Sequence, residues 1–536
     1  MTQFLLMAAI VIIACVLCNK ASSKLGVPTL LAFILLGMFF GSDGVVKIPF
    51  DNYLLAEDIC TLALIFIMFY GGFGTKWSEA RPVAVKAVLL SSLGTIATAG
   101  LVGLFCWGVL KLPLLESFLL GSVISSTDAA SVFSILRSKR LNLRYNTASL
   151  LEVESGSNDP FSYMLTVIVL SLMSGEASGW AFAYQIFAQL VYGGAFGVGV
   201  ALVTRAFLKR FRFASEGFDA VFIVAVALVA YAAPTLLGGN GYLSVYITGI
   251  LLGNHTIQNK QALVNFFDGA TGLMQMVLFF LLGLLSFPSH LPAIIPTALA
   301  AALFLTFVAR PLAVGLILGP FRSTFRQMAL VSWSGLRGAA SIVFSILAIT
   351  SSAVIDLDIY HIVFFIVLFS ILIQGTLLPL VSQKLDMTDN ESDVMKTFTD
   401  YTDEVPVQFL QCTLSPGHPW AGKAIMDLAL PPECLMVLLT RGGKKLVPNG
   451  STLLEPGDQL ILSGRSGGEV EGVHLYEKTI KKRDPWLHQS LSALDAGEKL
   501  IIMVRRGGEV IIPRGDTVLL EGDVLLINDM DGDPLT

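Results

Sequence analysis

The sequence predicts an α-helical polytopic membrane protein of about 13 transmembrane helices, followed by a small α+β tail. Three observations predict this fold class. The 536 residues are 54% hydrophobic and only 14% charged, whereas soluble proteins have about 25% charged residues. Apolar runs of roughly 20 residues, the length that crosses a bilayer, recur up to residue 384. From Asp386 the composition turns polar, and short β-like runs follow.

The apolar runs define the candidate membrane spans. The first run has neither a basic segment before it nor a small-residue cleavage site, so we expect a membrane helix there and not a signal peptide. The ninth run is short. The thirteen predicted spans are 3–19, 25–42, 59–74, 84–110, 113–136, 146–174, 181–204, 218–237, 241–254, 266–286, 291–319, 327–350 and 356–383.

The basic residues indicate how these spans are oriented. The chain has 20 Lys and Arg up to residue 383. With the N-terminus outside, sixteen of them fall on the cytoplasmic side, whereas only Lys47 and Lys111 fall outside. This is the positive-inside bias of membrane proteins, and it supports an odd number of spans. We therefore expect a bacterial inner-membrane protein with a periplasmic N-terminus and a cytoplasmic tail.

Five charged residues lie well inside the predicted spans, namely Asp128, Glu154, Asp159, Arg310 and Arg337. A charge at the bilayer centre costs about 2.5–3.5 kcal/mol on insertion scales, and such residues usually pair with one another or mark an ion path. Each of the five lies in a cluster of small or polar residues. Together they indicate a functional centre in the lipid bilayer.

Two spans carry sequences that favour a break in mid-membrane. Residues 125–131 of the fifth span are rich in Ser, Thr and Asp, which compete with helical backbone hydrogen bonds. In the twelfth span, Gly335 and Gly338 flank Arg337. Interrupted spans in corresponding positions of two halves point to a transporter's binding site. Asp128 would either neutralise the dipole of a half-helix or ligate the ion directly.

A second polar cluster, 154–160, lies in the sixth span. Its carboxylate, hydroxyl and amide oxygens suit a hard monovalent cation such as Na⁺ or K⁺. Asp159 can hold either a proton or a cation, and this competition is the basis of antiport. Glu154 lies five residues before Asp159, well round the helix, so we expect it to pair with an arginine in a structural role.

Several motifs in this order resemble the NhaP/NHE-like branch of the monovalent cation:proton antiporters. The resemblance covers about residues 1–384. The motifs that carry it are Thr127-Asp128, Asn158-Asp159, the stretch from Gly239-Asn240-Gly241-Tyr242-Leu243 through Gly249 to Gly253-Asn254, Arg310-Pro311, Gly335-Leu336-Arg337-Gly338 and Gln374-Gly375-Thr376.

The resemblance implies a homodimer of 13-helix subunits with inverted repeats, in which broken helices 5 and 12 cross. Transport would proceed by an elevator-like movement of a core domain. Asp159 would bind the ion and the proton, and Thr127, Asp128, Ser155 and Asn158 would ligate or order the site. Glu154 and Arg337 would form a buried ion pair. Arg310, Gly335 and Gly338 would support the helix breaks and the core.

The resemblance also bears on stoichiometry and ion choice. Asn158 stands where electrogenic relatives have a second Asp, which implies electroneutral one-for-one exchange. Many relatives carry an acidic residue in the third helix, where this chain has Tyr70 before Gly71-Gly72. This departure leaves the ligand set open, and it makes the subgroup linked to potassium and cell-volume control the best match. We expect K⁺/H⁺ antiport, with Na⁺/H⁺ antiport as the second reading.

The tail contains an internal repeat. Residues 385–405 are polar and acidic and are predicted to be a linker, and the transmembrane exchanger domain would end at residue 384. Arg441-Gly442-Gly443 and Gly457-Asp458 recur 65 residues later as Arg506-Gly507-Gly508 and Gly522-Asp523. Strand-like runs occur at 407–413, 435–440, 459–462, 500–504 and 524–527.

The first copy, 406–465, resembles the TrkA-C module of potassium-conductance regulators, and 466–536 looks like a second, divergent or shortened copy. The resemblance implies dimerisation and a regulatory small ligand, often a nucleotide; the alternative is a passive dimerisation module. No G-x-G-x-x-G follows a strand, so a Rossmann half is not expected. We expect no required cofactor.

Other function classes fit less well. The net charge of -5 gives no reason to expect a nucleic-acid partner. The sequence has no Walker A motif and no G-x-S-x-G, so we do not expect an enzyme. A ligand-gated cation channel is the alternative, because related tails occur in channels, but we find no selectivity-filter loop. An anion exchanger would need a basic centre, whereas acidic residues outnumber basic ones here.

Overall fold

The computed structural model divides the chain into two compact units, Met1–Thr402 and Asp403–Thr536. Each unit is described by itself. The structure describes residues 2–25, 28–50, 52–138, 141, 143–175, 179–211, 217–255, 257, 260–388, 407–415, 417–428, 430, 434–441, 444–446, 448–465, 475–480, 482, 484–494, 499–506, 509–511, 513 and 515–529.

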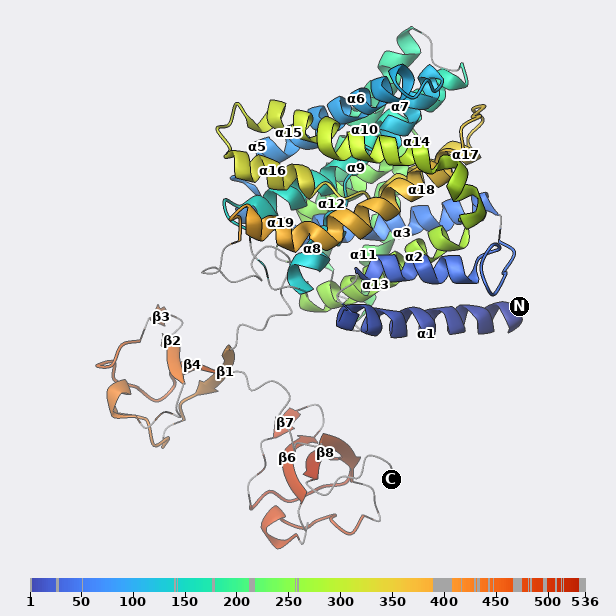
Figure 1. Ribbon diagram of the computed structural model, residues 1–536. Coiled ribbons are helices and arrows are strands. Elements are labelled where there is room, and N and C mark those ends of the chain that lie inside the picture. Colours follow the sequence, from blue (N-terminus) through green and yellow to red (C-terminus); the bar gives the residue numbers. More distant parts are fainter. Residues whose placement is uncertain are drawn as a thin grey trace. The chain divides into compact units, whose positions relative to one another are not determined.

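The first unit is a bundle of helices that run side by side (Figure 1). Its α-helices are α1 (Thr2–Leu25), α2 (Thr29–Phe40), α3 (Tyr53–Gly74), α4 (Trp77–Ala80), α5 (Ala84–Leu89), α6 (Thr95–Gly108), α7 (Leu114–Val123), α8 (Ala129–Ser138), α9 (Thr147–Met173), α10 (Trp180–Arg210), α11 (Phe218–Thr235), α12 (Gly241–Gly253), α13 (Lys260–Leu284), α14 (Leu291–Phe304), α15 (Arg310–Leu318), α16 (Phe325–Trp333), α17 (Ala339–Thr350), α18 (Ile359–Phe369) and α19 (Thr376–Lys384). Three π-helical turns, η1 (Leu90–Gly94), η3 (Leu305–Ala309) and η4 (Ser370–Gly375), and one 3₁₀ turn, η2 (Pro288–His290), complete them.

The predicted spans agree with these helices. Every predicted span coincides with one helix, or with two helical segments separated by a break or a π-helical turn. In the described residues, 7 segments are at least 18 residues long and apolar enough to cross a membrane. The other predicted spans have shorter apolar parts, are interrupted or, in α9, contain many polar residues. The helical membrane fold is therefore confirmed, and the number of crossings stays a prediction.

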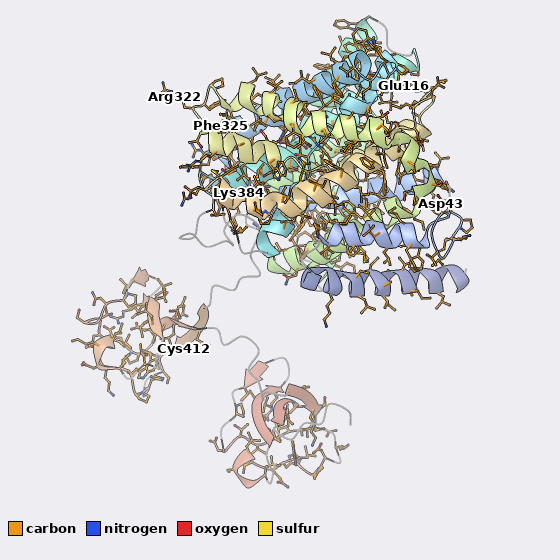
Figure 2. The ribbon with its side chains drawn as sticks, viewed as in Figure 1. Asp43, Glu116, Arg322, Phe325, Lys384 and Cys412 are labelled. Carbon is orange, nitrogen blue, oxygen red and sulfur yellow. The ribbon has the colours of Figure 1, made fainter. Side chains whose placement is uncertain are left out.

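The loops gather at two opposite ends of the bundle. Figure 2 shows Arg322, Phe325 and Lys384 at one end and Asp43 and Glu116 at the other. The predicted alternation of spans places the same residues on the same two sides. A bundle with one span too many or too few would have scrambled this division.

Hydrogen bonds connect the loops at each end. At one end, Glu116 accepts from the backbone N–H groups of Asp356 and Leu357 at 3.2 and 3.1 Å. At the other end, the Asp386 carboxylate pairs with Arg144 and Arg326 at 3.2 and 3.0 Å. Each contact joins loops that the predicted alternation assigns to one side of the membrane.

The two predicted helix breaks are confirmed. The fifth span stops at Val123 and resumes at Ala129, and the twelfth stops at Trp333 and resumes at Ala339. The two breaks touch, because the Asp128 N–H donates to the Leu336 carbonyl at 2.8 Å. Backbone groups that a continuous helix would have paired internally therefore pair between two broken helices.

The two halves also share a feature that the sequence did not suggest. A π-helical turn interrupts the span immediately before each broken one, η1 in the fourth and η3 in the eleventh. Such turns insert one extra residue and often occur at functional sites. The matching positions support the predicted internal repeat of the membrane unit.

Glycines bring α3 and α12 into close contact. A Cβ atom at Gly249 or Gly253 would overlap with the backbone of Phe69 or Phe73. Small residues allow this approach of membrane helices, whose association depends on packing. The contact explains why the glycine motif of the ninth span is spaced as it is, and it fixes α3 and α12 beside the site described below.

The tail unit contains two four-stranded antiparallel sheets with the same topology. The first has the order β1-β4-β2-β3 and the second β5-β8-β6-β7. Their elements are β1 (Val407–Thr413), η5 (Ile425–Asp427), β2 (Leu435–Arg441), β3 (Lys444–Leu446), β4 (Gln459–Arg465), β5 (Leu475–Thr479), η6 (Leu491–Ala493), β6 (Lys499–Arg506), β7 (Glu509–Ile511) and β8 (Val524–Asp529), where η5 and η6 are 3₁₀ turns.

The two sheets agree in detail. A register shift lies between Met436 and Leu438 in the first sheet, and 65 residues later between Ile501 and Met503 in the second. The five predicted strands are confirmed, whereas β3, β5 and β7 were not predicted. The second copy is not shortened in its sheet, which corrects one of the two expectations for it.

Candidate ion-binding site

A cavity of about 420 Å³ lies where the two broken spans meet α9. One side of it is formed by both breaks, α8, α9 and the start of α17. The other side is formed by α3, α12 and α13. The cavity therefore lies between two groups of helices, and both predicted half-helix breaks open onto it.

Asp159 lines this cavity from α9. Its Oδ1 atom is buried, and it has no hydrogen-bond partner among the residues that the structure describes. A buried carboxylate oxygen without a donor is costly unless a proton, a cation or water satisfies it. The buried Asp159 carboxylate can thus accept a proton or bind a small cation.

Thr127, Ser155 and Asn158 form one network around the first break. The Asn158 Nδ2 donates to the Thr127 hydroxyl at 2.6 Å, and the Thr127 N–H donates to Asn158 Oδ1 at 3.3 Å. The Ser155 hydroxyl donates to the Thr127 carbonyl at 2.6 Å. Thr127 and Ser155 line the cavity, whereas fully buried Asn158 holds Thr127 from behind. The network fixes the broken segment against α9.

Asp128 lies at the start of α8 and also faces the cavity. Its carboxylate accepts hydrogen bonds from the Ser131 N–H and hydroxyl. This is the position in which a carboxylate stabilises a helix N-terminus. A Cβ atom at Gly338 would overlap with the Asp128 side chain. Gly338 is therefore needed for the close approach of the two breaks.

Arg337 is buried in the second break. Its Nη1 donates to the Ser126 carbonyl at 2.6 Å, which connects it to the first break. Its backbone N–H donates to the Ser370 hydroxyl at 3.0 Å, and that hydroxyl donates to Gln374 at 2.6 Å. The guanidinium thus satisfies a carbonyl that the broken helix leaves without an internal partner.

The predicted ion pair of Glu154 with Arg337 is wrong, because Glu154 pairs with Arg310. The Arg310 Nη2 atom lies 2.7 Å from Glu154 Oε1 and 2.8 Å from Oε2, and both side chains are buried. Arg310 directly follows the π-helical turn η3. A Cβ atom at Gly335 would lie 2.9 Å from Arg310 Nε, so this glycine provides the space for the guanidinium.

Sequence reasoning missed two carboxylates that face the cavity, Glu152 of α9 and Asp268 of α13. Glu152 is buried and accepts a hydrogen bond from the Thr75 hydroxyl at 3.2 Å. Tyr70 of α3 donates its hydroxyl to Asp268 Oδ1 at 3.2 Å. Both acids lie within predicted spans, and that signal was present in the sequence. Next to Tyr70, the structure thus places a carboxylate that comes from another helix.

These oxygen atoms can hold a hard monovalent cation. Asp159 supplies a carboxylate, and Thr127 and Ser155, which also line the cavity, supply hydroxyl oxygens. A hard cation prefers such oxygen ligands. The same Asp159 can instead take a proton, so the site can hold the two ions alternately.

Comparison with known proteins agrees with this architecture. Residues 8–384 match the family described as sodium/hydrogen exchanger, transmembrane, and residues 410–469 and 475–527 each match the TrkA-C domain. A solved structure of the sodium proton antiporter MjNhaP1 from Methanocaldococcus jannaschii has the same fold, with a TM-score of 0.63 and 22% identity, covering 72% of this chain and 99% of that one.

Two curated relatives cover most of the chain. A Shewanella baltica protein named K(+)/H(+) antiporter NhaP2 is 32% identical over 469 residues, which are 86% of this chain and 81% of the relative. An Alkalimonas amylolytica protein named K(+)/H(+) antiporter NhaP is 31% identical over 462 residues, 85% of this chain and 80% of the relative. The chain belongs to the sodium/hydrogen exchanger family, and it carries two TrkA-C domains after the membrane unit.

Proposed function

We propose that this protein exchanges K⁺ for H⁺ across the bacterial inner membrane, one for one, with Asp159 as the group that holds each ion in turn. The observation that carries the proposal is the Asp159 carboxylate at the meeting point of two broken helices, with Oδ1 buried and without a partner in the described residues. The names of the relatives favour K⁺ as the cation. Na⁺ is the second candidate.

Electrostatics explains why the two fluxes are coupled. An ionised Asp159 exposes a charge that costs about 2.5–3.5 kcal/mol in the bilayer centre. A bound proton and a bound K⁺ each remove that charge, and they leave the centre with the same net charge. The loaded forms can therefore change their access, whereas the empty form is held back. Since one carboxylate carries either ion, the exchange is electroneutral.

Thr127 and Ser155 order the broken segment and offer oxygen ligands beside Asp159, and Asn158 positions Thr127. Asp128 stabilises the start of α8, and its carboxylate lines the same cavity as Asp159. Arg337, through the Ser126 carbonyl, connects the two breaks, and the Glu154–Arg310 pair connects α9 to α15. These roles separate the residues that meet the ion from those that keep the broken helices in place.

The mobile part is the group of helices that carries both breaks and α9. These elements form one side of the cavity, and α3, α12 and α13 form the other. A shift of the first group against the second would carry Asp159 from one side of the membrane to the other, as in an elevator. By the positive-inside bias, Tyr70 and Asp268 lie near the cytoplasmic ends of their spans, so this cavity opens toward the cytoplasm.

The two TrkA-C domains regulate the exchange from the cytoplasm, and we include in the proposal a small ligand such as a nucleotide, together with a homodimer. The domain boundaries would be 384 for the membrane unit, 385–405 for the linker and 465 between the two copies. The match of residues 410–469 and 475–527 to TrkA-C supports two copies after the linker, with the first match running to residue 469. No cofactor takes part in the exchange itself.

The test uses purified full-length protein in proteoliposomes with a pH-sensitive dye inside. An outward K⁺ gradient should drive proton uptake well above that of protein-free vesicles. Valinomycin, which imposes the K⁺ diffusion potential, should leave this excess over protein-free vesicles unchanged. Asp159→Asn should reduce this flux to that of protein-free vesicles, while its melting temperature in detergent stays near that of the wild type. Exchange that survives in Asp159→Asn, or K⁺ flux without proton counterflow as in a channel, would refute the proposal.

A further inference from the structure

Glu152, Gly156 and Asp159 lie on one face of α9. They are four and three residues apart, which is the spacing of neighbours along one side of a helix. All three line the cavity, whereas Glu154 points to Arg310. The Glu152 and Asp159 positions are about 10 Å apart along the helix axis. The cavity therefore has a second carboxylate on the same face as the exchange site, two turns nearer the start of α9.

Asp268 provides a third carboxylate, and it comes from the opposite wall. It is exposed, and the hydroxyl of buried Tyr70 donates to its Oδ1 at 3.2 Å. An ionised carboxylate has about four lone-pair sites, so one hydrogen bond leaves it able to ligate a cation. Because Asp268 is exposed and lines the same cavity, it marks the mouth, whereas Asp159 lies deeper.

Two buried hydroxyl groups that line the same cavity point to a ligand. The Thr271 Oγ1 and the Tyr246 hydroxyl are buried without a hydrogen-bond partner among the described residues, and both residues line the cavity. Thr271 lies three residues after Asp268, on the same face of α13. The Tyr246 ring packs on Gly156, where an added Cβ atom would lie 2.7 Å from its hydroxyl.

We propose that Asp268, Glu152, Thr271 and Tyr246 form a second site for a monovalent cation, at the mouth of the cavity that leads to Asp159. Tyr70 positions the Asp268 carboxylate. The site would hold the cation briefly before it passes to Asp159, and it would not carry a proton in the exchange. The inference deepens the proposed function and depends on it.

The negative charge of the second site determines how the site should affect transport. Carboxylates in a narrow cavity raise the local concentration of cations by a factor of about 10 or more, and salt weakens this effect. Loss of the site should therefore lower the exchange rate at low cation concentration. The exchange rate at saturating cation should change little. A residue that only supports the fold would lower the maximal rate and the amount of folded protein instead.

The test compares Asp268→Asn with the wild type in the same proteoliposomes, with K⁺ varied at constant total ionic strength. The apparent KM for K⁺ should rise about tenfold, and the maximal rate should fall less than threefold. Asp268→Glu should restore a near-normal KM, and Tyr70→Phe should raise it by a smaller factor. The rise for Asp268→Asn should shrink when choline chloride increases the ionic strength.

Asp219→Asn is the matched control. Asp219 lies in the first turn of α11 and does not line the cavity, and the predicted alternation puts it at the same end of the bundle as Asp268. This variant loses the same charge and should keep the wild-type KM. An unchanged KM in Asp268→Asn, or an equal rise in Asp219→Asn, would overturn the second site. Failure of the proposed function would instead appear in the wild type or in Asp159→Asn.

Discussion

At the scale of single residues, the side chains of α9 point in two directions, some into the cavity and others against neighbouring helices. Glu152, Ser155 and Asp159 face the cavity. Glu154 and Asn158, on other faces, are buried against Arg310 and Thr127. Under the proposed function, one face of α9 would thus meet the ion, whereas the other polar residues fix the neighbouring helices.

The Glu154–Arg310 pair should matter for stability more than for ion choice. Arg310→Ala leaves the Glu154 carboxylate buried without its cation, which should lower the free energy of unfolding by about 3–5 kcal/mol. Thermal unfolding of the purified protein in detergent measures this loss. Arg210→Ala, at the exposed end of α10, is the control and should keep the wild-type midpoint.

A double variant separates the pair from general damage. Glu154→Gln combined with Arg310→Met removes both charges and should recover part of the stability that Arg310→Ala loses, because no isolated charge remains buried. If Arg310→Ala unfolds at the same temperature as Arg210→Ala, the ion pair does not stabilise the protein.

The sequence indicated that these charged residues form one functional centre. It did not indicate which arginine pairs with Glu154. Arg310 and Arg337 are both buried arginines in the second half of the chain. Composition and spacing alone therefore do not distinguish which of them pairs with Glu154. The π-helical turn before Arg310 and the space left at Gly335 decide the partner. Both are features of packing, and neither has a distinct sequence signature.

At the scale of elements, the helix breaks were predictable because their sequences oppose a continuous helix. The fifth span has clustered Ser, Thr and Asp, and the twelfth has Gly-Leu-Arg-Gly. Each of these sequences destabilises the helix within a few residues of itself. The walls of the cavity were not predictable in the same way. Tyr70, Tyr246 and Asp268 come from three helices that are distant in sequence, and only the fold brings them together.

The two tail sheets carry equivalent ion pairs. Arg441 donates to Asp458 at 2.8 and 2.7 Å, and Arg506 donates to Asp523 at the same distances. In each sheet, the hydrogen bond from the arginine holds the pKa of the aspartic acid below its ordinary value. The sequence repeat thus includes the same arginine–aspartate ion pair in each of the two sheets.

This shift predicts how the first sheet responds to pH. The folded pKa of Asp458 lies below the unfolded value of about 3.9, so the pair stabilises the sheet at any pH above about 4. The contribution disappears as the pH falls through the folded pKa. Hydrogen exchange of residues 407–465 in the full-length protein should show constant stability from pH 7 to 5 and a loss below about pH 4.

Asp458→Asn tests the cause. It should destabilise the first sheet by about 1–2 kcal/mol at pH 7, a modest value because Arg441 is partly exposed. It should also remove most of the acid-induced loss. The second sheet, with Asp523 intact, is the internal control and should stay unchanged. Equal acid sensitivity of the first sheet in the variant and the wild type would contradict this assignment.

At the scale of the whole molecule, the chain combines a membrane unit, which carries the proposed exchange site, with a tail that contains two TrkA-C domains. The sequence predicted this division from the change in composition near residue 385. The end of the membrane unit also has contacts that composition does not reveal. Asp386 pairs with Arg144 and Arg326, and the Arg144 N–H donates to the Met387 carbonyl at 2.9 Å.

These contacts decide where a truncation should be made. A chain that ends at Thr388 keeps the Asp386 contacts and removes both TrkA-C domains. We expect it to exchange K⁺ for H⁺ at a rate within a few-fold of the wild type, but without the response to cytoplasmic ligands, because Asp159 and its cavity lie wholly in the membrane unit. A chain that ends at Leu385 should exchange as well, with a melting temperature lower by a few degrees, since exposed ion pairs contribute about 0–1 kcal/mol each. Initial rates in proteoliposomes, with melting curves for both truncations, measure these effects. A truncation at Thr388 that melts like the wild type and shows no exchange would mean that the tail is an obligatory part of the transport machinery.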